Sequence, residues 1–356
     1  MSLLALHDFH KNLNARFGLV SGGEVVEDYG DPMADYEALS GSAGVLDLGF
    51  RGRLCLTGAD RARFLHGQVT NDVKALRPGE GCYAALITAK GKMQSDLNIF
   101  CLPDELLLDF EPGLANAIKE RLEKYIIADD VQVIEAAPHY GLLGLIGPQA
   151  AGVIKALGIF TELPTKPMNW VSINDSGFGL VYLMLNPRLS DTSFDLFVPN
   201  ASLKSFAEKL IQAARTVGGR TCGWRAFETA RIEAGIPRFG ADMDESNIPL
   251  EAGLETRAIS FNKGCYIGQE IISRIKTYGQ VAKALRRIRI DEIKTVPAKG
   301  EKLSKDGKEA GYMTSCVFSP KYKATIGLGY VRKEVNQPGT ELTLETQLGH
   351  TRAIIL

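Results

Sequence analysis

A cysteine set between two glycines is the feature of this sequence that most suggests chemistry. Cys265 has Gly264 directly before it and Gly268 three residues after it. Glycine tolerates positive φ and lets another backbone or a ligand come close, so this spacing predicts a shaped turn. The residues from Gln269 onward can continue as a short helix, which places Cys265 just before a helix N-terminus, where anions are favoured. The surrounding octapeptide is Lys263, Gly264, Cys265, Tyr266, Ile267, Gly268, Gln269 and Glu270.

Two interpretations of this cysteine follow from the residues. Lys263 adds positive charge, and together with the helix start it favours the thiolate form of Cys265, as at a reactive cysteine. The plainer alternative is a buried structural cysteine in a tight turn, because free cysteine is usually a small hydrophobe.

A carboxylate within an apolar strand is the second candidate for chemistry. Residues 82–88 and 93–100 alternate as two strands, joined by a turn that contains Gly91, and this pattern predicts a hairpin. Asp96 lies in the second strand, beside Leu97. A buried unpaired charge is costly, so Asp96 faces either solvent or a site, and both alternatives stay open at this point.

Residues 263–289 are strongly basic, with seven positive side chains against one acid, Glu270. One interpretation is that lysine and arginine protect strand edges. The other is an anion site, for example for RNA phosphate, although aromatic residues are not interleaved with the charges. The positive residues are Lys263, Arg274, Lys276, Lys283, Arg286, Arg287 and Arg289.

Composition limits the class of protein. At 356 residues the chain is long enough for two or three domains, and 45% hydrophobic with 23% charged residues is typical of a globular protein. A formal net charge of −1 argues against a generally basic nucleic-acid binder. None of the six cysteines forms a CxxC pair or has zinc-ligand spacing, so we expect no metal and a reducing cytoplasm. We expect neither a signal peptide nor a membrane helix.

The elements predict a mixed α+β fold. Helices are expected at 8–17 and 32–39, followed by strands and helices that recur in the manner of antiparallel sheets. From residue 284 the pattern becomes all β, with about six short strands and a turn at Asp306-Gly307, which predicts a small barrel.

The octapeptide resembles the signature Lys-Gly-Cys-Phe/Tyr-x-Gly-Gln-Glu of the YgfZ family, and it matches at every specified position. That family consists of folate-binding relatives of the glycine-cleavage T-protein (aminomethyltransferase), linked to iron–sulfur cluster maintenance and tRNA modification. Residues 67–70 and 230–235 are similar to further family segments. The resemblance covers essentially the whole chain and is sharpest at 226–276.

The resemblance implies roles for four residues. Asp96 corresponds to the T-protein aspartate that faces the reactive nitrogen of folate, with Ser95 in place of that family's preceding acid. Tyr83 matches a tyrosine that lines the folate pocket, and Arg231 an arginine that lies against the folate. Asp195 matches, in shortened form, a glutamate that holds the pterin ring, while Arg188 stands where the T-proteins have tyrosine.

The resemblance also implies a T-protein-like body of antiparallel sheets and helices around a central channel, with a C-terminal β-barrel. We expect an N-terminal domain at 1–135, to which 226–280 returns, a second domain at 136–225 and the barrel at 281–356. Cys265 and Asp96 are the expected catalytic residues, and the basic run would suit a folate polyglutamate tail.

The implied function is a cytoplasmic tetrahydrofolate-binding protein, or one that binds a one-carbon derivative, supporting iron–sulfur enzymes or their assembly proteins. Aminomethyltransferase activity is the first alternative, which would make the protein a folate-dependent one-carbon transferase. The second alternative is a non-catalytic folate- or tRNA-binding module, although the sequence has no RNA-binding motif.

Overall fold

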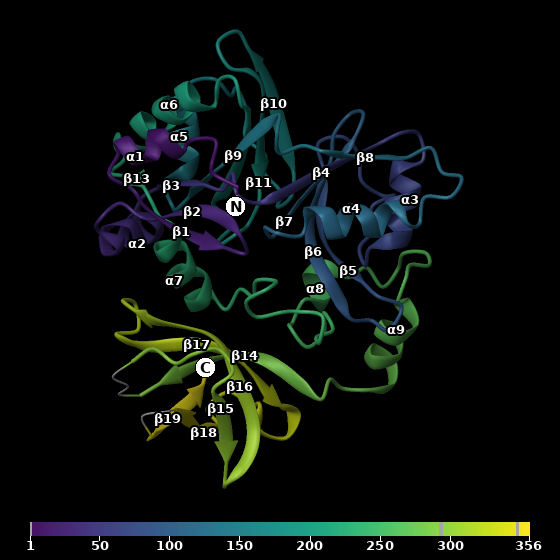
Figure 1. Cartoon of the computed structure of the whole chain (residues 1–356), viewed down its shortest axis with the longest axis vertical. Helices are drawn as coiled ribbons and strands as arrows, with labels where there is room; N and C mark the ends of the chain where they lie inside the picture. The colour runs from purple at the N-terminus through teal and green to yellow at the C-terminus, as the bar shows by residue number, and fades with distance from the viewer. Residues whose placement is uncertain (1, 292–294, 347–348) are drawn as a thin grey trace. The chain divides into compact units, whose positions relative to one another are not determined.

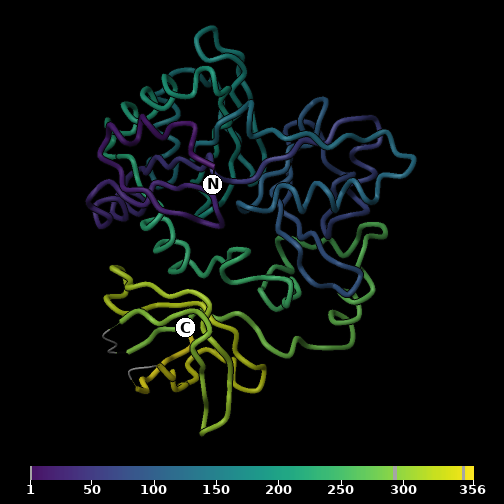
Figure 2. Tube along the Cα trace, viewed as in Figure 1, coloured from purple at the N-terminus to yellow at the C-terminus, as the bar shows by residue number. Residues whose placement is uncertain are grey.

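The computed structural model describes residues 2–291, 295–346 and 349–356, and it divides into two compact units. Figure 2 traces the chain through both. The first unit comprises Met1–His66, Asp72–Ala84 and Leu97–Ala230. The second comprises Gly67–Asn71, Ala85–Asp96 and Arg231–Leu356.

A six-stranded sheet forms one part of the first unit (Figure 1). Its neighbours pair antiparallel except for the last pair, which is parallel. Helices α5 (Ala150–Leu157) and α6 (Leu203–Arg215) pack their apolar faces on it through residues such as Val153 and Phe206. The strand order is β10 (Trp170–Asp175), β11 (Gly179–Leu185), β12 (Ser193–Pro199), β9 (Tyr140–Ile146), β3 (Gly44–Asp47) and β13 (Arg220–Thr221).

A five-stranded sheet carries the predicted hairpin. Two helices lie between strands of this sheet in the chain order, α3 (Arg61–Gln68) before β5 and α4 (Ala115–Glu123) before β8. The hairpin expected at 82–88 and 93–100 is confirmed as β5 and β6, with Gly91 at positive φ in the turn. The strand order is β5 (Gly81–Ile87), β6 (Met93–Cys101), β7 (Leu106–Phe110), β4 (Gly52–Thr57) and β8 (Gln132–Glu135).

The N-terminal prediction was wrong in part. Helix α1 (His7–Asn12) ends where Asn14 takes a positive φ of 59°, so the helix expected at 8–17 stops early. The chain then forms a two-stranded sheet of β1 (Arg16–Val20) and β2 (Gly23–Asp28). Helix α2 (Pro32–Gly41) follows, and the side chain of its N-cap Asp31 accepts from the Ala34 N–H.

The predicted C-terminal barrel is confirmed as a closed six-stranded barrel in the second unit. Its core contains Ile288, Leu303 and Met313, all without exposed surface. The predicted turn at Asp306-Gly307 joins β15 to β16, and both residues have positive φ. The barrel order is β14 (Lys283–Ile290), β17 (Ala324–Arg332), β16 (Lys308–Ser319), β15 (Lys302–Lys305), β18 (Glu341–Thr346) and β19 (Gly349–Ile355).

The rest of the second unit is mainly helices and loops. Helix α7 (Trp224–Ala234) leads into it, and α8 (Glu255–Ala258) and α9 (Gln269–Tyr278) precede the barrel. The mixed α+β class with a terminal barrel is therefore as expected, while the finer boundaries at 135, 225 and 281 stay a prediction. No helix in the described ranges is both long and apolar enough to cross a membrane.

Candidate functional site

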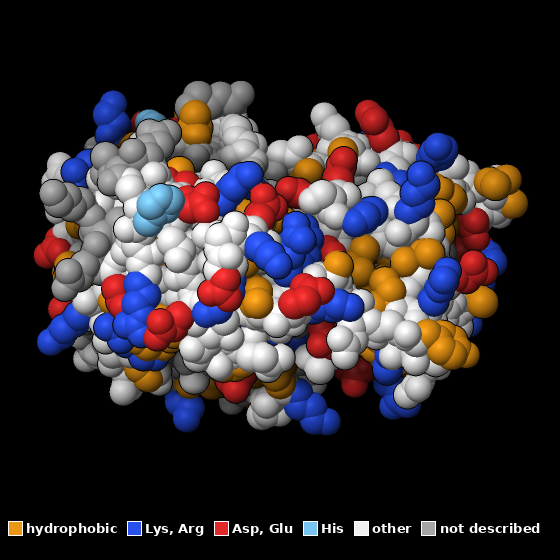
Figure 3. Space-filling model, turned by 90° about the horizontal axis from the view of Figure 1, so that it is seen from below, with side chains coloured by type: hydrophobic (Ala, Val, Ile, Leu, Met, Phe, Trp, Pro, Cys, Tyr) orange, Lys and Arg blue, Asp and Glu red, His pale blue; other side chains and the backbone are white. Residues whose placement is uncertain are grey.

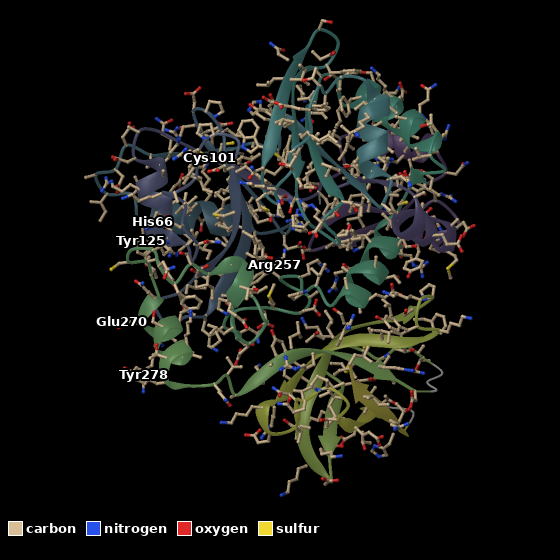
Figure 4. The ribbon with its side chains drawn as sticks, turned by 180° about the vertical axis from the view of Figure 1, so that it is seen from behind. His66, Cys101, Tyr125, Arg257, Glu270 and Tyr278 are labelled. Atoms are coloured by element: carbon tan, nitrogen blue, oxygen red, sulfur yellow. The ribbon has the colours of Figure 1, made fainter. Side chains whose placement is uncertain are left out.

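The octapeptide forms the predicted turn and helix start. Gly268 is the N-cap of α9 with φ of 84°, a value that suits glycine. A Cβ at this position would lie 2.5 Å from the carbonyl oxygen of Thr88, so the close approach of the β5–β6 turn also requires glycine. The Ile267 N–H donates to the Gly67 carbonyl. The segment is thus held on both sides, and Glu270 and Tyr278 mark the two ends of the helix that it starts (Figure 4).

Cys265 is exposed, whereas the other five cysteines are buried or half-buried. Burial raises the pKa of the Cys316 thiol to about 12 and also raises that of Cys55. Exposure removes the interpretation of Cys265 as a buried core residue and leaves its sulfur accessible to a reaction partner.

Lys263 anchors the octapeptide from inside. Its side chain is buried, and the ammonium donates to the carbonyl of Val69 at 2.7 Å. The same ammonium lies 4.7 Å from the ring centroid of Tyr266, at cation–π range. Burial raises the pKa of the Tyr266 hydroxyl to about 12. Lys263 therefore binds the segment to the loop 67–71, and its role as a charge beside Cys265 stays a prediction.

Asp96 is half-buried on β6, and its Oδ1 atom is buried. The turn that precedes it is hydrogen-bonded to the loop 246–247 within the second unit, because the Met93 N–H donates to the Asn247 carbonyl and Lys92 Nζ to the Ser246 carbonyl. Gly91 faces Ile271 of α9 so closely that a Cβ would lie 2.9 Å from its side chain. Asp96 and the octapeptide thus belong to one packed body.

Arg231 is almost entirely buried, with 1% of its surface exposed. Its Nη1 donates to Asp242 Oδ2 at 2.5 Å and to the Ile236 carbonyl, and its Nη2 to Ser315 Oγ at 3.0 Å. Thr314 Oγ1 donates to the other Asp242 oxygen at 2.6 Å. A buried guanidinium with these partners ties the segment after α7 to strand β16.

Asp195 lies on β12 without exposed surface, in a bidentate pair with Arg188. Arg188 Nε donates to Oδ1 at 2.8 Å and Nη2 to Oδ2 at 2.7 Å, while Asn186 donates to Oδ2 at 2.8 Å. Arg188 Nη2 also donates to Asp109 Oδ2 at 2.7 Å. Both oxygens of Asp195 are therefore engaged by protein donors.

Sequence reasoning missed the wider ionic network around Asp109, whose side chain has no exposed surface. Arg51 donates to Asp109 at 2.7 Å and to Glu111, and Asn98 donates to Asp109 at 2.8 Å. Burial pushes the pKa of Asp109 up, but the Arg188 and Arg51 guanidiniums outweigh it and hold that pKa well below its usual value. The available signal was a single charged residue in each of two otherwise apolar strands, Arg53 in β4 and Asp109 in β7.

The five predicted site residues divide between the two units. Tyr83, half-buried on β5, and Asp195 belong to the first unit. Asp96, Arg231 and Cys265 belong to the second. Of these, Cys265 is exposed, Asp96 and Tyr83 are half-buried, and Asp195 and Arg231 are deeply buried.

The basic run does not form one patch, because most of its members have separate partners. Lys283 donates to the Tyr312 hydroxyl, Arg286 to the Asn336 carbonyl and Arg287 to the Glu233 carbonyl. On the face shown in Figure 3, lysine and arginine side chains are interspersed with acidic ones. Within the described ranges, no group of three His, Cys, Asp or Glu residues is placed to hold a metal ion.

Two family models match the chain. The model described as "GCVT N-terminal domain" matches residues 6–263, and the "Glycine cleavage T-protein C-terminal barrel domain" matches residues 283–356. The second match coincides with the six-stranded barrel, and the first includes Tyr83, Asp96 and Arg231.

Curated proteins and a solved structure are also similar. A putative chloroplastic transferase of Arabidopsis thaliana is 28% identical over 95% of this chain and 76% of its own length. Aminomethyltransferases of Halalkalibacterium halodurans and Bacillus subtilis are 28% and 25% identical, over 88% and 96% of this chain and 85% and 93% of their own. The crystal structure of aminomethyltransferase T from Bartonella henselae matches with a TM-score of 0.88 at 22% identity, covering 99% of this chain and 96% of that one.

Proposed function

This chain belongs to the glycine cleavage T-protein family, and on that premise we propose that it binds tetrahydrofolate and takes part in one-carbon transfer. The observation that carries the proposal is the family match across both the body and the barrel, together with curated relatives named aminomethyltransferase. When bound, the folate would supply the nitrogen that carries the one-carbon unit.

Asp96 is the residue that we propose to act directly on the folate. A half-buried carboxylate is shielded from bulk water, which strengthens a hydrogen bond to a ligand nitrogen. It can accept that bond or hold a proton there. For Tyr83, also half-buried, a folate-binding role stays a proposal of its own.

Asp195 and Arg231 fit a supporting role better than direct contact. The oxygens of Asp195 are taken by Arg188 and Asn186, so the residue does not fit a pterin clamp unless this pair opens. The guanidinium of Arg231 already donates hydrogen bonds to Asp242 and Ser315. We propose that Arg231 stabilises the protein around the folate site and does not contact the folate itself.

Calorimetric titration with tetrahydrofolate tests the folate proposal. Asp96→Asn keeps the shape of the side chain and removes its charge, and we expect binding to weaken by about tenfold or more, the size of one charge-assisted hydrogen bond. Asp104→Asn is the matched control, since Asp104 is exposed after β6. Equal affinities of the wild type and Asp96→Asn would reject the role of Asp96, and absent binding to the wild type would reject the folate site.

The finer proposal is a YgfZ-like role in supporting iron–sulfur enzymes, including those that modify tRNA. It is supported by Cys265, an exposed thiol in a segment that Lys263 and Gly268 hold in a defined turn. The test is the activity of iron–sulfur enzymes in cells that carry Cys265→Ala, with Cys316→Ala as control. Unchanged activity in Cys265→Ala cells would reject the thiol's role.

The second candidate is aminomethyltransferase activity, which the names of the curated relatives favour. Arg188, paired with Asp195 in place of the family's tyrosine, argues against it. An assay of methylene transfer from a loaded lipoyl carrier protein to tetrahydrofolate distinguishes aminomethyltransferase activity from the YgfZ-like role. Only aminomethyltransferase activity predicts turnover in this assay. A non-catalytic tRNA-binding module would instead show RNA retention that falls steeply with salt and does not need Cys265.

A further inference from the structure

A cavity of about 880 Å³ lies within the second unit, between the α8–α9 region and one end of the barrel. This volume is within the range of small-molecule sites. In the described part of the chain, its lining includes neither Asp96 nor Arg231 nor Cys265. Apolar side chains make up part of the wall, namely Leu250, Ile259, Phe261, Ile275, Val281 and Ala284.

The charge of the lining is mainly positive. Lys276, Arg286 and Lys333 line the cavity, against the single acid Glu255. Lys276 and Lys333 are exposed and Arg286 is half-buried, so the positive groups are accessible beside an apolar wall. A ligand that satisfies both features carries an anionic group on an apolar body.

Arg286 is oriented in advance for such a ligand. Its Nε donates to the Asn336 carbonyl at 3.0 Å and its Nη1 to the Leu285 carbonyl at 3.0 Å. These two bonds fix the plane of the guanidinium, while Nη2 has no hydrogen-bond partner among the described residues. An arginine held in this way loses little freedom when it binds a carboxylate or phosphate.

Phe261 gives the apolar wall an aromatic surface beside a cation. The ammonium of Lys276 lies 3.3 Å from the centroid of its ring, which holds the end of α9 against the loop that carries Phe261. Polar groups that could orient a ligand complete the lining, among them Ser260, Asn262 and Gln280.

We propose that this cavity is a binding site for a small organic anion, an aromatic or apolar body that carries one carboxylate or phosphate group. Arg286 binds the anionic group, Lys333 and Lys276 add to the positive field, and the apolar body packs on Ile259, Phe261 and Val281. The site is separate from the proposed action of Asp96 on folate.

Two dyes with nearly the same aromatic body test the proposal. 8-Anilinonaphthalene-1-sulfonate carries an anion, and N-phenyl-1-naphthylamine lacks it. We expect the wild-type protein to bind the sulfonate about tenfold more tightly than the neutral dye, as one charge-assisted hydrogen bond would provide. Equal affinities of the two dyes would overturn the proposal.

Three variants test whether the preference for the sulfonate dye arises in this cavity. Arg286→Gln is expected to reduce the preference for the sulfonate to near one, and Lys333→Gln, an exposed change that spares the fold, to reduce it by about two- to fivefold. Arg289→Gln is the matched control, because Arg289 lies on the same strand but outside the cavity, beside Asp291. If Arg286→Gln does not fold, the dye preference of Lys333→Gln tests the proposal in its place. An unchanged preference in Lys333→Gln, or a loss in Arg289→Gln, would overturn the proposal.

Competition then distinguishes the sources of the anion. Displacement of the sulfonate dye by adenosine monophosphate indicates a phosphate ligand, and displacement by 4-aminobenzoate a carboxylate ligand. Displacement by neither would contradict the proposed ligand class. Asp96→Asn is expected to leave dye binding unchanged, so failure of this site and failure of the folate site are separate results.

Discussion

Arg188 and Asp195 form a bidentate ion pair in the interior of the first unit, with N···O distances of 2.7 and 2.8 Å. Arg188 also bridges to Asp109, so one guanidinium joins two acids from different sheets. The pair compensates the charge of a carboxylate that has no exposed surface. Asp195 therefore stabilises the interior of the first unit, and its oxygens are already hydrogen-bonded to protein donors.

Removing the charge of Asp195 should therefore destabilise the protein. We expect Asp195→Asn to lower the free energy of unfolding by about 2–4 kcal/mol, because it leaves Arg188 partly uncompensated in the interior. Chemical denaturation measures this loss, and Asp191→Asn, an exposed change in the same loop region, should change stability by less than about 0.5 kcal/mol. A fully stable Asp195→Asn protein would contradict the structural role.

Acid should weaken the network around Asp109. The folded-state pKa of this carboxyl is depressed below its ordinary value of 3.8, so its stabilisation is fully present above that value and is lost as the pH falls further. Unfolding midpoints in urea at pH 6 and pH 3 should therefore differ more in the wild type than in Asp109→Asn. Equal pH dependence in the two proteins would show that Asp109 does not carry this effect.

Cys265 should be the fastest thiol to react. In the folded protein a disulfide reagent such as 5,5′-dithiobis(2-nitrobenzoate) should modify one thiol rapidly, because the other cysteines are buried or half-buried and burial raises the pKa of Cys101 and Cys316. Cys265→Ala should abolish the rapid phase and change stability by less than about 0.5 kcal/mol. A rapid phase that persists in Cys265→Ala but disappears in Cys316→Ala would contradict the assignment.

Gly268 should not tolerate a side chain. Alanine there combines a φ of 84° with a Cβ 2.5 Å from the Thr88 carbonyl, and we expect a loss of about 2–4 kcal/mol in the free energy of unfolding. Gly253 has a similar φ of 72° but open space around it, so Gly253→Ala should cost only about 1 kcal/mol. Equal losses in the two variants would show that the close contact with the β5–β6 turn does not contribute to the free energy of unfolding lost in Gly268→Ala.

The sequence by itself determined the features that depend on local pattern. Alternating residues and a glycine turn predicted the β5–β6 hairpin, and six short strands predicted the barrel. Glycine spacing predicted the turn and helix start around Gly268, because these conformations follow from steric limits on nearby residues. The helix expected at 8–17 failed where Asn14 leaves helical φ, which periodicity does not register.

Only the tertiary structure decided which polar side chains are already engaged. Arg188 and Asp109 are 79 residues apart in the chain, and Lys263 reaches Val69 across 194 residues. Whether a charge faces solvent, a ligand or another charge depends on such distant partners, since a buried ionic group needs compensation that local sequence does not specify. The same folding leaves Cys265 exposed and places Arg286 in a cavity whose wall is partly apolar and partly polar.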